Sequence, residues 1–149
     1  MTSKKTVIFS LLIGIAVQLT AVSLHAQGDK FKGRLAPVPA LGIPAPTVAG
    51  EGTLAATLSG RKLTVSGTFQ KMASAATVAK LCSGEITGKR GECTIDLTVS
   101  KTGEGKTGTL AGTIDLTPQQ VDELKKGKLY VQVHSEGAPN GHLMGWLLK

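Results

Sequence analysis

Aromatic side chains are scarce in this sequence, whose 149 residues include one Trp, one Tyr and three Phe. The formal net charge is +7, but the Lys and Arg residues are spread along the chain without a dense basic run. Proteins that bind single-stranded nucleic acids combine positive charge with aromatic side chains on which bases stack. The composition therefore argues against a nucleic-acid partner and favours solvated surface lysines.

Catalytic motifs are also missing. The sequence has no nucleophile motif, no phosphate-binding loop and no His–Glu spacing of a zinc hydrolase. A superoxide dismutase would need several histidines around its metal, whereas this chain has only His25, His134 and His142. We therefore predict that the protein is not an enzyme.

The first 26 residues have the composition of a secretory signal peptide. A basic start at Lys4 and Lys5 precedes an apolar run over 7–22, and Ala26 supplies the small residue before a cleavage site. The run is shorter than the ~20 residues of a typical transmembrane helix. We predict a cleaved signal peptide at 1–26, and hence a secreted or periplasmic protein without membrane attachment after cleavage.

Cysteine is limited to Cys82 and Cys93. An even number of cysteines in an exported protein predicts a disulfide, and only one pairing within the chain exists. Closing so short a loop would stabilise the fold by about 2–3 kcal/mol. The alternative is that one of the two cysteines is a copper or zinc ligand.

The predicted mature chain begins at Gln27 and divides into two segments. Residues 27–49 contain four prolines, which lack the N–H groups that join a sheet, so they predict a linker or an irregular edge. A first strand beginning at Phe31 and Leu35 is the alternative for this segment. Residues 50–149 have the length of one domain, commonly ~100–150 residues, and we predict a single β domain there.

Apolar and polar residues alternate along much of 50–149, which is typical of β-strands with one buried face. The clearest alternation occupies 53–58, 63–69, 93–100 and 108–116, and a weaker one occupies 77–82. Glycine-rich turns separate these segments. The pattern predicts an all-β, antiparallel sandwich or barrel.

One short helix interrupts the strands. Thr117 is placed to cap the helix, Pro118 suits its first position, and Gln120 completes a capping box. Gly127 offers a C-terminal stop. Because this segment presents no nucleophile or ligand set, we interpret the helix as structural.

The last predicted hairpin divides its side chains between two faces. Its core face carries Leu129, Val131, Val133, Leu143, Gly145 and Leu147. The opposite face carries six residues that we call the hairpin row: Tyr130, Gln132, His134, His142, Met144 and Trp146. With His134 opposite His142, Gln132 would face Met144 and Tyr130 would face Trp146.

Two binding hypotheses follow from the hairpin row. Exposed large side chains such as Met144 and Trp146 favour contact with a protein or a surface polymer. Imidazole and thioether groups instead suit copper or zinc, which predicts a metal site of His134, His142 and Met144. A third interpretation is an inert face that only strengthens the hairpin.

The same hairpin resembles the end of the CHRD domain, which is found in chordin. The family pattern is Leu-Tyr-Val, a polar residue, Val-His, a hydroxyl residue, a Pro-Gly turn and a hydrophobic-x-Gly strand, and 129–135 with 139–147 are similar to it. Segments 63–69 and 116–120 are similar too. The resemblance runs from about Gly50 to the C-terminus, and it implies an extracellular immunoglobulin-like or Cu/Zn superoxide-dismutase-like β domain with no settled biochemical activity.

The sequence departs from the family pattern at two places, although His134 matches it. Lys80, Leu81 and Cys82 stand where many bacterial members have His-x-His, and His142 and Met144 stand where the last strand usually has Glu and Arg. Taken together, the sequence predicts a non-enzymatic, exported interaction or structural module that contacts a protein or surface polymer.

Overall fold

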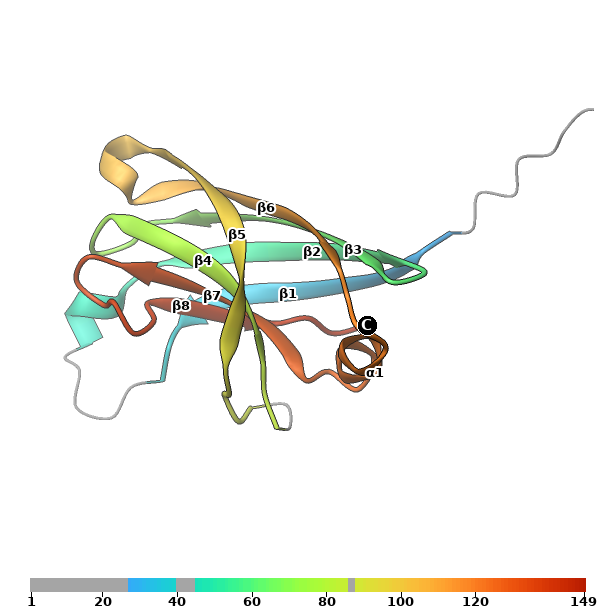
Figure 1. Ribbon diagram of the computed structural model, residues 1–149. Helices are drawn as coiled ribbons and strands as arrows, with labels where there is room; N and C mark the ends of the chain where they lie inside the picture. The colour runs from blue at the N-terminus through green and yellow to red at the C-terminus, as the bar shows by residue number, and fades with distance from the viewer. Residues whose placement is uncertain (1–26, 40–44, 86–87) are drawn as a thin grey trace, which may run out of the picture.

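The described residues of this computed structural model, 27–39, 45–85 and 88–149, form eight antiparallel strands that close into a barrel (Figure 1). The strands are β1 (Asp29–Pro37), β2 (Glu51–Ser59), β3 (Lys62–Gln70), β4 (Ala76–Ser83), β5 (Cys93–Thr102), β6 (Thr107–Asp115), β7 (Leu129–Ser135) and β8 (Leu143–Trp146). The helical segments are α1 (Pro118–Lys125) and two 3-10 turns, η1 (Ala45–Val48) and η2 (Gly103–Gly105). The predicted signal peptide, 1–26, lies outside the described residues.

The strand order around the barrel is β1-β2-β3-β6-β5-β4-β7-β8, and β8 pairs with β1 to close it. Because β3 lies beside β6 rather than β4, the chain makes the long crossover typical of a Greek key. The prediction of an all-β antiparallel fold with one short α-helix is confirmed. A closer likeness to the immunoglobulin or superoxide dismutase folds stays a prediction.

The segment 27–49 differs from the predicted linker. Its first part forms β1, which pairs with β2 along its length and with β8 at its end, so it is not an irregular edge. Phe31 and Leu35 point into the barrel and are buried. The prolines were misleading because Pro37 is the last residue of β1 and the other three follow the strand. The alternative of a first strand at Phe31 and Leu35 is therefore correct.

Alternate residues of each strand point into the barrel, as the two-residue alternation predicts. The β2–β3 turn contains Gly60, whose φ of 62° lies in the left-handed region that favours glycine. The interior is packed with large side chains, among them Phe31, Leu35, Leu54, Leu63, Phe69, Leu81, Leu110, Val131, Val133, Leu143 and Leu147. Because an eight-stranded barrel is just wide enough for side chains to fill it, a binding surface is expected on the outside of the barrel.

Helix α1 begins where the sequence predicts. The Thr117 hydroxyl accepts the Gln120 N–H at 3.2 Å, and the Gln120 side-chain oxygen accepts the Thr117 N–H at 2.9 Å. Pro118 stands in the first turn, and Gly127 follows the helix with a φ of 70°. Leu124 is buried against the barrel. The capping box is thus confirmed, and the helix is held by its ends and by one buried side chain.

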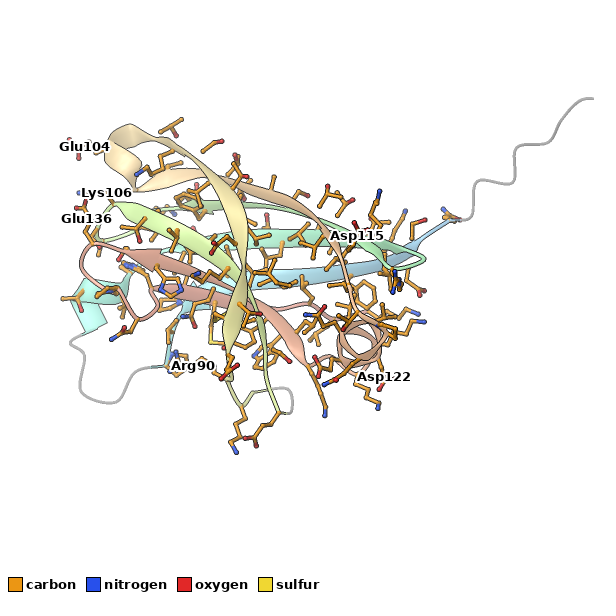
Figure 2. The ribbon with its side chains drawn as sticks, in the orientation of Figure 1. Arg90, Glu104, Lys106, Asp115, Asp122 and Glu136 are labelled. Atoms are coloured by element: carbon orange, nitrogen blue, oxygen red, sulfur yellow. A yellow bond between two sulfur atoms is a disulfide. The ribbon has the colours of Figure 1, made fainter. Side chains whose placement is uncertain are left out.

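Charged side chains occupy both ends of the barrel. Glu104 and Lys106 lie at the β5–β6 turn, whereas Asp115 and Asp122 lie at the end that carries α1 (Figure 2). In the described part of the chain, none of the helices has the length and apolar composition needed to span a membrane.

Candidate functional site

Two of the three predicted cross-strand pairs of the terminal hairpin are confirmed, whereas His142 lies before β8 and is not paired with His134. Tyr130 pairs with Trp146 and Gln132 with Met144. The two aromatic rings lie 4.7 Å apart between centroids, at a tilt of 49°. Such a tilted aromatic pair contributes about 0.5–1.5 kcal/mol beyond its buried area.

The expected exposure of the hairpin row is wrong for four of its six members. Tyr130, Gln132, His142 and Met144 are buried, and His134 and Trp146 are half-buried. The chain itself covers this face, because other segments fold over the outside of β7 and β8. Val38, Cys82, Tyr130 and Met144 form a second hydrophobic cluster there, with Cys93 and Trp146 packed against it. We call these six residues the outer cluster.

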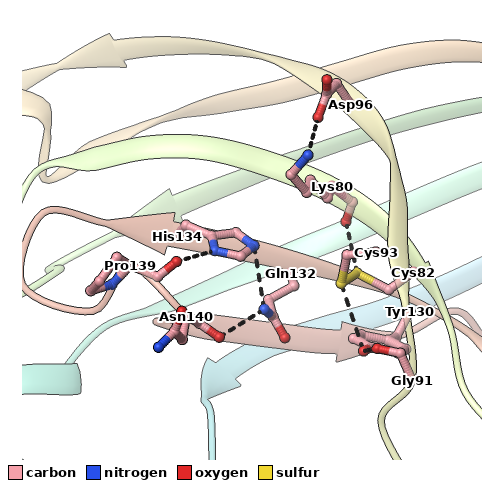
Figure 3. Close-up of a disulfide and its surroundings, with 10 residues drawn as sticks. All are labelled: Lys80, Cys82, Gly91, Cys93, Asp96, Tyr130, Gln132, His134, Pro139 and Asn140. Carbon is pink, nitrogen blue, oxygen red and sulfur yellow. Dashed lines mark hydrogen bonds and ion pairs between the residues drawn. A yellow bond between two sulfur atoms is a disulfide. The ribbon is translucent and has the colours of Figure 1, made fainter.

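A disulfide joins Cys82 and Cys93, which both belong to the outer cluster (Figure 3). The prediction of this pairing is confirmed. The disulfide connects the ends of the β4–β5 loop, and the loop backbone at Gly84 lies so close to the Trp146 ring that a Cβ at this position would come within 2.6 Å of it. The disulfide and the close approach of glycine together hold the loop against the aromatic pair.

Tyr130 connects the loop to the barrel through its hydroxyl group. The hydroxyl donates to the Gly91 carbonyl oxygen at 3.0 Å. Burial raises the pKa of the Tyr130 phenol above its ordinary value, because the ionised form would lose its hydration. The phenol is therefore a structural donor and is neutral around pH 7.

His134 is held by its neighbours in one neutral tautomer. Its Nδ1 lies 2.7 Å from the Pro139 carbonyl oxygen, which can only accept, so Nδ1 carries the proton. Its Nε2 then accepts from the Gln132 side-chain amide at 3.3 Å, and that amide also donates to the Asn140 carbonyl oxygen at 3.1 Å (Figure 3). The lone pair of His134 is thus already occupied.

His142 is held in the opposite tautomer. Its Nε2 donates to the Ala49 carbonyl oxygen at 2.7 Å. The Ser135 hydroxyl accepts from the Ser74 hydroxyl at 2.8 Å and from the Ala138 N–H at 3.1 Å, so its own proton goes to His142 Nδ1 at 2.6 Å. His142 therefore connects the β7–β8 turn to the segment before β2, and its predicted place on the exposed face is wrong.

The hydrogen bonds of His134 and His142 affect the predicted copper or zinc site, because they involve the imidazole nitrogens that would bind the metal. A ligating imidazole offers its lone pair to the metal, and the lone pairs of His134 and His142 each accept a hydrogen bond. Within the described residues, no group of three or more His, Cys, Asp or Glu side chains could hold a metal ion. Both imidazole lone pairs are therefore used within the chain, and a metal site of His134, His142 and Met144 stays a prediction.

A different outer face is exposed and carries small side chains in its three central rows. We define the threonine face by the outward residues of these rows on β2, β3, β6 and β5, which are Thr53, Ala55, Thr57, Thr64, Ser66, Thr68, Thr109, Ala111, Thr113, Thr98 and Ser100. All of them are exposed. The larger outward residues Lys62, Gln70, Asp96 and Asp115 lie outside these rows. Thr and other β-branched residues fit the pleated surface of a sheet well, and the Thr53 and Thr68 hydroxyls bond across the strands at 3.0 Å.

The register arranges this face in rows that cross the strands. The central row is made of short side chains, because Ser66 pairs with Ala55 on one side and Ala111 on the other. Thr68 lies in the next row, between Thr53 and Thr109. A groove of about 520 Å³ follows these two rows, and Lys32 lines its β1 end.

The charge beside this groove is positive at β1. Lys30, Lys32 and Arg34 occupy alternate, outward positions on that strand. Arg34 lies 3.6 Å from Glu51, whose pKa is held below its ordinary value by a hydrogen bond from Lys71. For Lys30 and Lys32, the described residues contain no carboxylate within ion-pairing distance.

Sequence reasoning missed the threonine face. The signal was present in the polar positions of 53–57, 64–68 and 107–113. Each strand alone shows only an ordinary solvent side. The face emerges because the crossover places β3 beside β6, which the alternation does not predict.

These features define a small, disulfide-bonded antiparallel β-barrel domain with one outer face covered by its own chain and another face open. The chain belongs to the CHRD domain family, whose family model matches residues 34–147. The match begins inside β1, earlier than the predicted domain start at Gly50. In the same comparisons no curated protein and no solved structure gave a match. Membership in this family supports an interaction module in general.

Proposed function

We propose that the protein is an exported, non-enzymatic interaction module and that the threonine face is its contact surface. The observation that carries the proposal is the groove of about 520 Å³ over the rows around Ser66 and Thr68. The rows present hydroxyl groups that both donate and accept hydrogen bonds. A partner can therefore form many weak polar contacts there without displacing any packed side chain.

The hairpin row is a less suitable contact surface in this proposal. Tyr130 and Met144 are occupied by the outer cluster, and both histidines are committed to hydrogen bonds within the chain. No observation at these residues favours copper or zinc binding as a second function. The row is better explained as an internal support that positions the β4–β5 loop and the β7–β8 turn.

Export is supported by two features. The N-terminal 26 residues have the composition of a signal peptide, and the Cys82–Cys93 disulfide fits an oxidising compartment. We expect the mature chain to begin at Gln27 in the periplasm or outside the cell. N-terminal sequencing of the exported protein checks this start.

Cosedimentation with an envelope fraction tests the contact surface. The fraction is prepared from cells that lack the gene, and the chain from Gln27 to Lys149 is added to it. We expect binding that Ser66→Trp abolishes, because the large ring fills the groove. The matched control is Val78→Trp on β4, at an exposed position outside the threonine face. No binding by the unmutated chain, or equal binding by both variants, would contradict the proposal.

A further inference from the structure

We infer that the partner of the threonine face is an acidic polysaccharide whose carboxylate groups meet Lys30 and Lys32 while its sugar hydroxyls bond the threonine rows. This inference rests on the proposed function, since it names the chemical class that the same face would bind. Three observations support it, namely the shape of the groove, the chemistry of its lining and the position of the positive charge.

The groove lining extends across four neighbouring strands, as a site for an extended chain requires. It crosses the strands from Lys32 on β1 toward β6, and the central row continues to Thr98 on β5. Neighbouring strands lie about 4.8 Å apart, so the row from β1 to β5 is about 19 Å long. That length accommodates several linked sugar rings lying across the strands.

The lining favours a polyhydroxylated ligand over a protein. Binding energy in protein interfaces concentrates in buried aromatic and Arg anchors that fill pockets. The lining of this groove has no aromatic or Arg residue, and its central row is Ala55, Ser66 and Ala111. Thr53, Thr68 and Thr109 add hydroxyl groups beside it. Sugar hydroxyls can exchange hydrogen bonds with these groups at many positions along the chain.

The charge at the β1 end selects an acidic ligand. Lys30 and Lys32 are exposed and lack a carboxylate partner among the described residues, whereas Asp29 is paired with Lys149 at 2.8 Å. Asp96, at the opposite side of the sheet, is paired with Lys80 at 2.5 Å. The uncompensated charge next to the groove is therefore positive, and it complements carboxylate groups.

A nucleic acid would also be attracted by the positive charge of Lys30 and Lys32, but the groove lining does not suit its bases. Single-stranded nucleic acids gain affinity by stacking bases on aromatic side chains. The residues that define the threonine face include no aromatic side chain. We therefore favour a carboxylated glycan and treat an oligonucleotide as a competitor in the test.

Calorimetric titration of the chain from Gln27 to Lys149 with polygalacturonate tests the inference. We expect saturable binding that weakens as salt is raised, and no binding of the neutral glucan dextran. Lys30→Gln with Lys32→Gln should weaken binding about five- to thirtyfold, the effect of two exposed charge contacts. The matched control is Lys89→Gln with Arg90→Gln, which removes the same charge from the β4–β5 loop, outside the strands of the threonine face; Arg90 is labelled in Figure 2.

Three other results would each contradict the inference. Equal losses in the two double variants would show a response to net charge alone. Equal affinity for an oligothymidylate of matched charge would show an unselective polyanion site. If polygalacturonate does not bind but the Ser66→Trp variant still loses envelope binding, then the acidic glycan is wrong and the contact surface is right.

Discussion

One outer face of this barrel is covered by its own chain and another is exposed, although both consist of outward-pointing residues on neighbouring antiparallel strands. On β7 and β8 the outward side chains are large, and the chain covers them with the β4–β5 loop and Val38. In the threonine face on β2, β3 and β6 the outward side chains carry small hydroxyl and methyl groups, and all of them are exposed. Alternation alone does not distinguish a covered face from an exposed one. The size and polarity of the outward residues do.

Replacement of His142 should have the largest effect on the covered face. His142→Leu leaves the Ala49 carbonyl and the Ser135 hydroxyl without their buried partner, and we expect a loss of about 3–4 kcal/mol in the free energy of unfolding. Urea denaturation measures this loss. The half-buried His134 is the control, because His134→Leu should cost about 1 kcal/mol. Similar losses for the two variants would contradict the assigned burial of His142.

Removal of the disulfide should have the next largest effect. Cys82→Ser with Cys93→Ser removes the constraint on the β4–β5 loop, and we expect a loss of about 2–3 kcal/mol. Because the loop lies against the ring of Trp146, the sole tryptophan, its fluorescence emission should also shift to longer wavelength. An unchanged emission spectrum would show that the disulfide does not hold this cover in place.

Tyr130→Phe should have a smaller effect that is confined to the loop contact. The variant keeps the ring beside Trp146 but removes the donor to the Gly91 carbonyl, and we expect a loss of about 1 kcal/mol. Thermal unfolding measures the difference. Trp146→Leu removes the partner ring without removing the donor to the Gly91 carbonyl. A double-mutant cycle of Tyr130→Leu and Trp146→Leu measures the ring contact, and an absence of coupling would show that the rings do not support one another.

Alkaline titration examines the burial of the same tyrosine without a substitution. Tyr130 is the only tyrosine, so phenolate absorbance reports one group, and its pKa should lie above the ordinary value of 10.0 because of burial. The unfolded chain releases this proton first. The contribution to stability is therefore complete below pH 10 and falls as the pH rises through the raised pKa. A midpoint at or below 10 would contradict the burial of the phenol.

Substitutions on the open face should have the smallest effect on stability. Thr64→Ala and Thr109→Ala remove exposed hydroxyl groups, and we expect each to change the free energy of unfolding by less than about 0.5 kcal/mol. Urea denaturation beside the His142 variant gives the comparison. A loss above 2 kcal/mol for either threonine would mean that this face is a structural element, as the hairpin row is.

The fold could be predicted further from the sequence than the site. Alternation predicted the strands β2 and β3 and the register of Tyr130 opposite Trp146, because these features depend on local pattern and on neighbouring strands with short turns. The burial of His142 could not be predicted, because its partners Ala49 and Ser135 come from a distant segment and from the hairpin's other strand. Likewise, the threonine face depends on a crossover between strands far apart in the chain.

Nuclear magnetic resonance titration of the labelled chain with polygalacturonate tests most directly whether the open face, and not the hairpin row, is the contact surface. Our account predicts chemical-shift changes in β1, β2, β3 and β6, centred on Ser66 and Lys32, with the Trp146 indole and His134 ring signals unchanged. Changes centred on Trp146 and His134, with Ser66 and Lys32 unaffected, would contradict it.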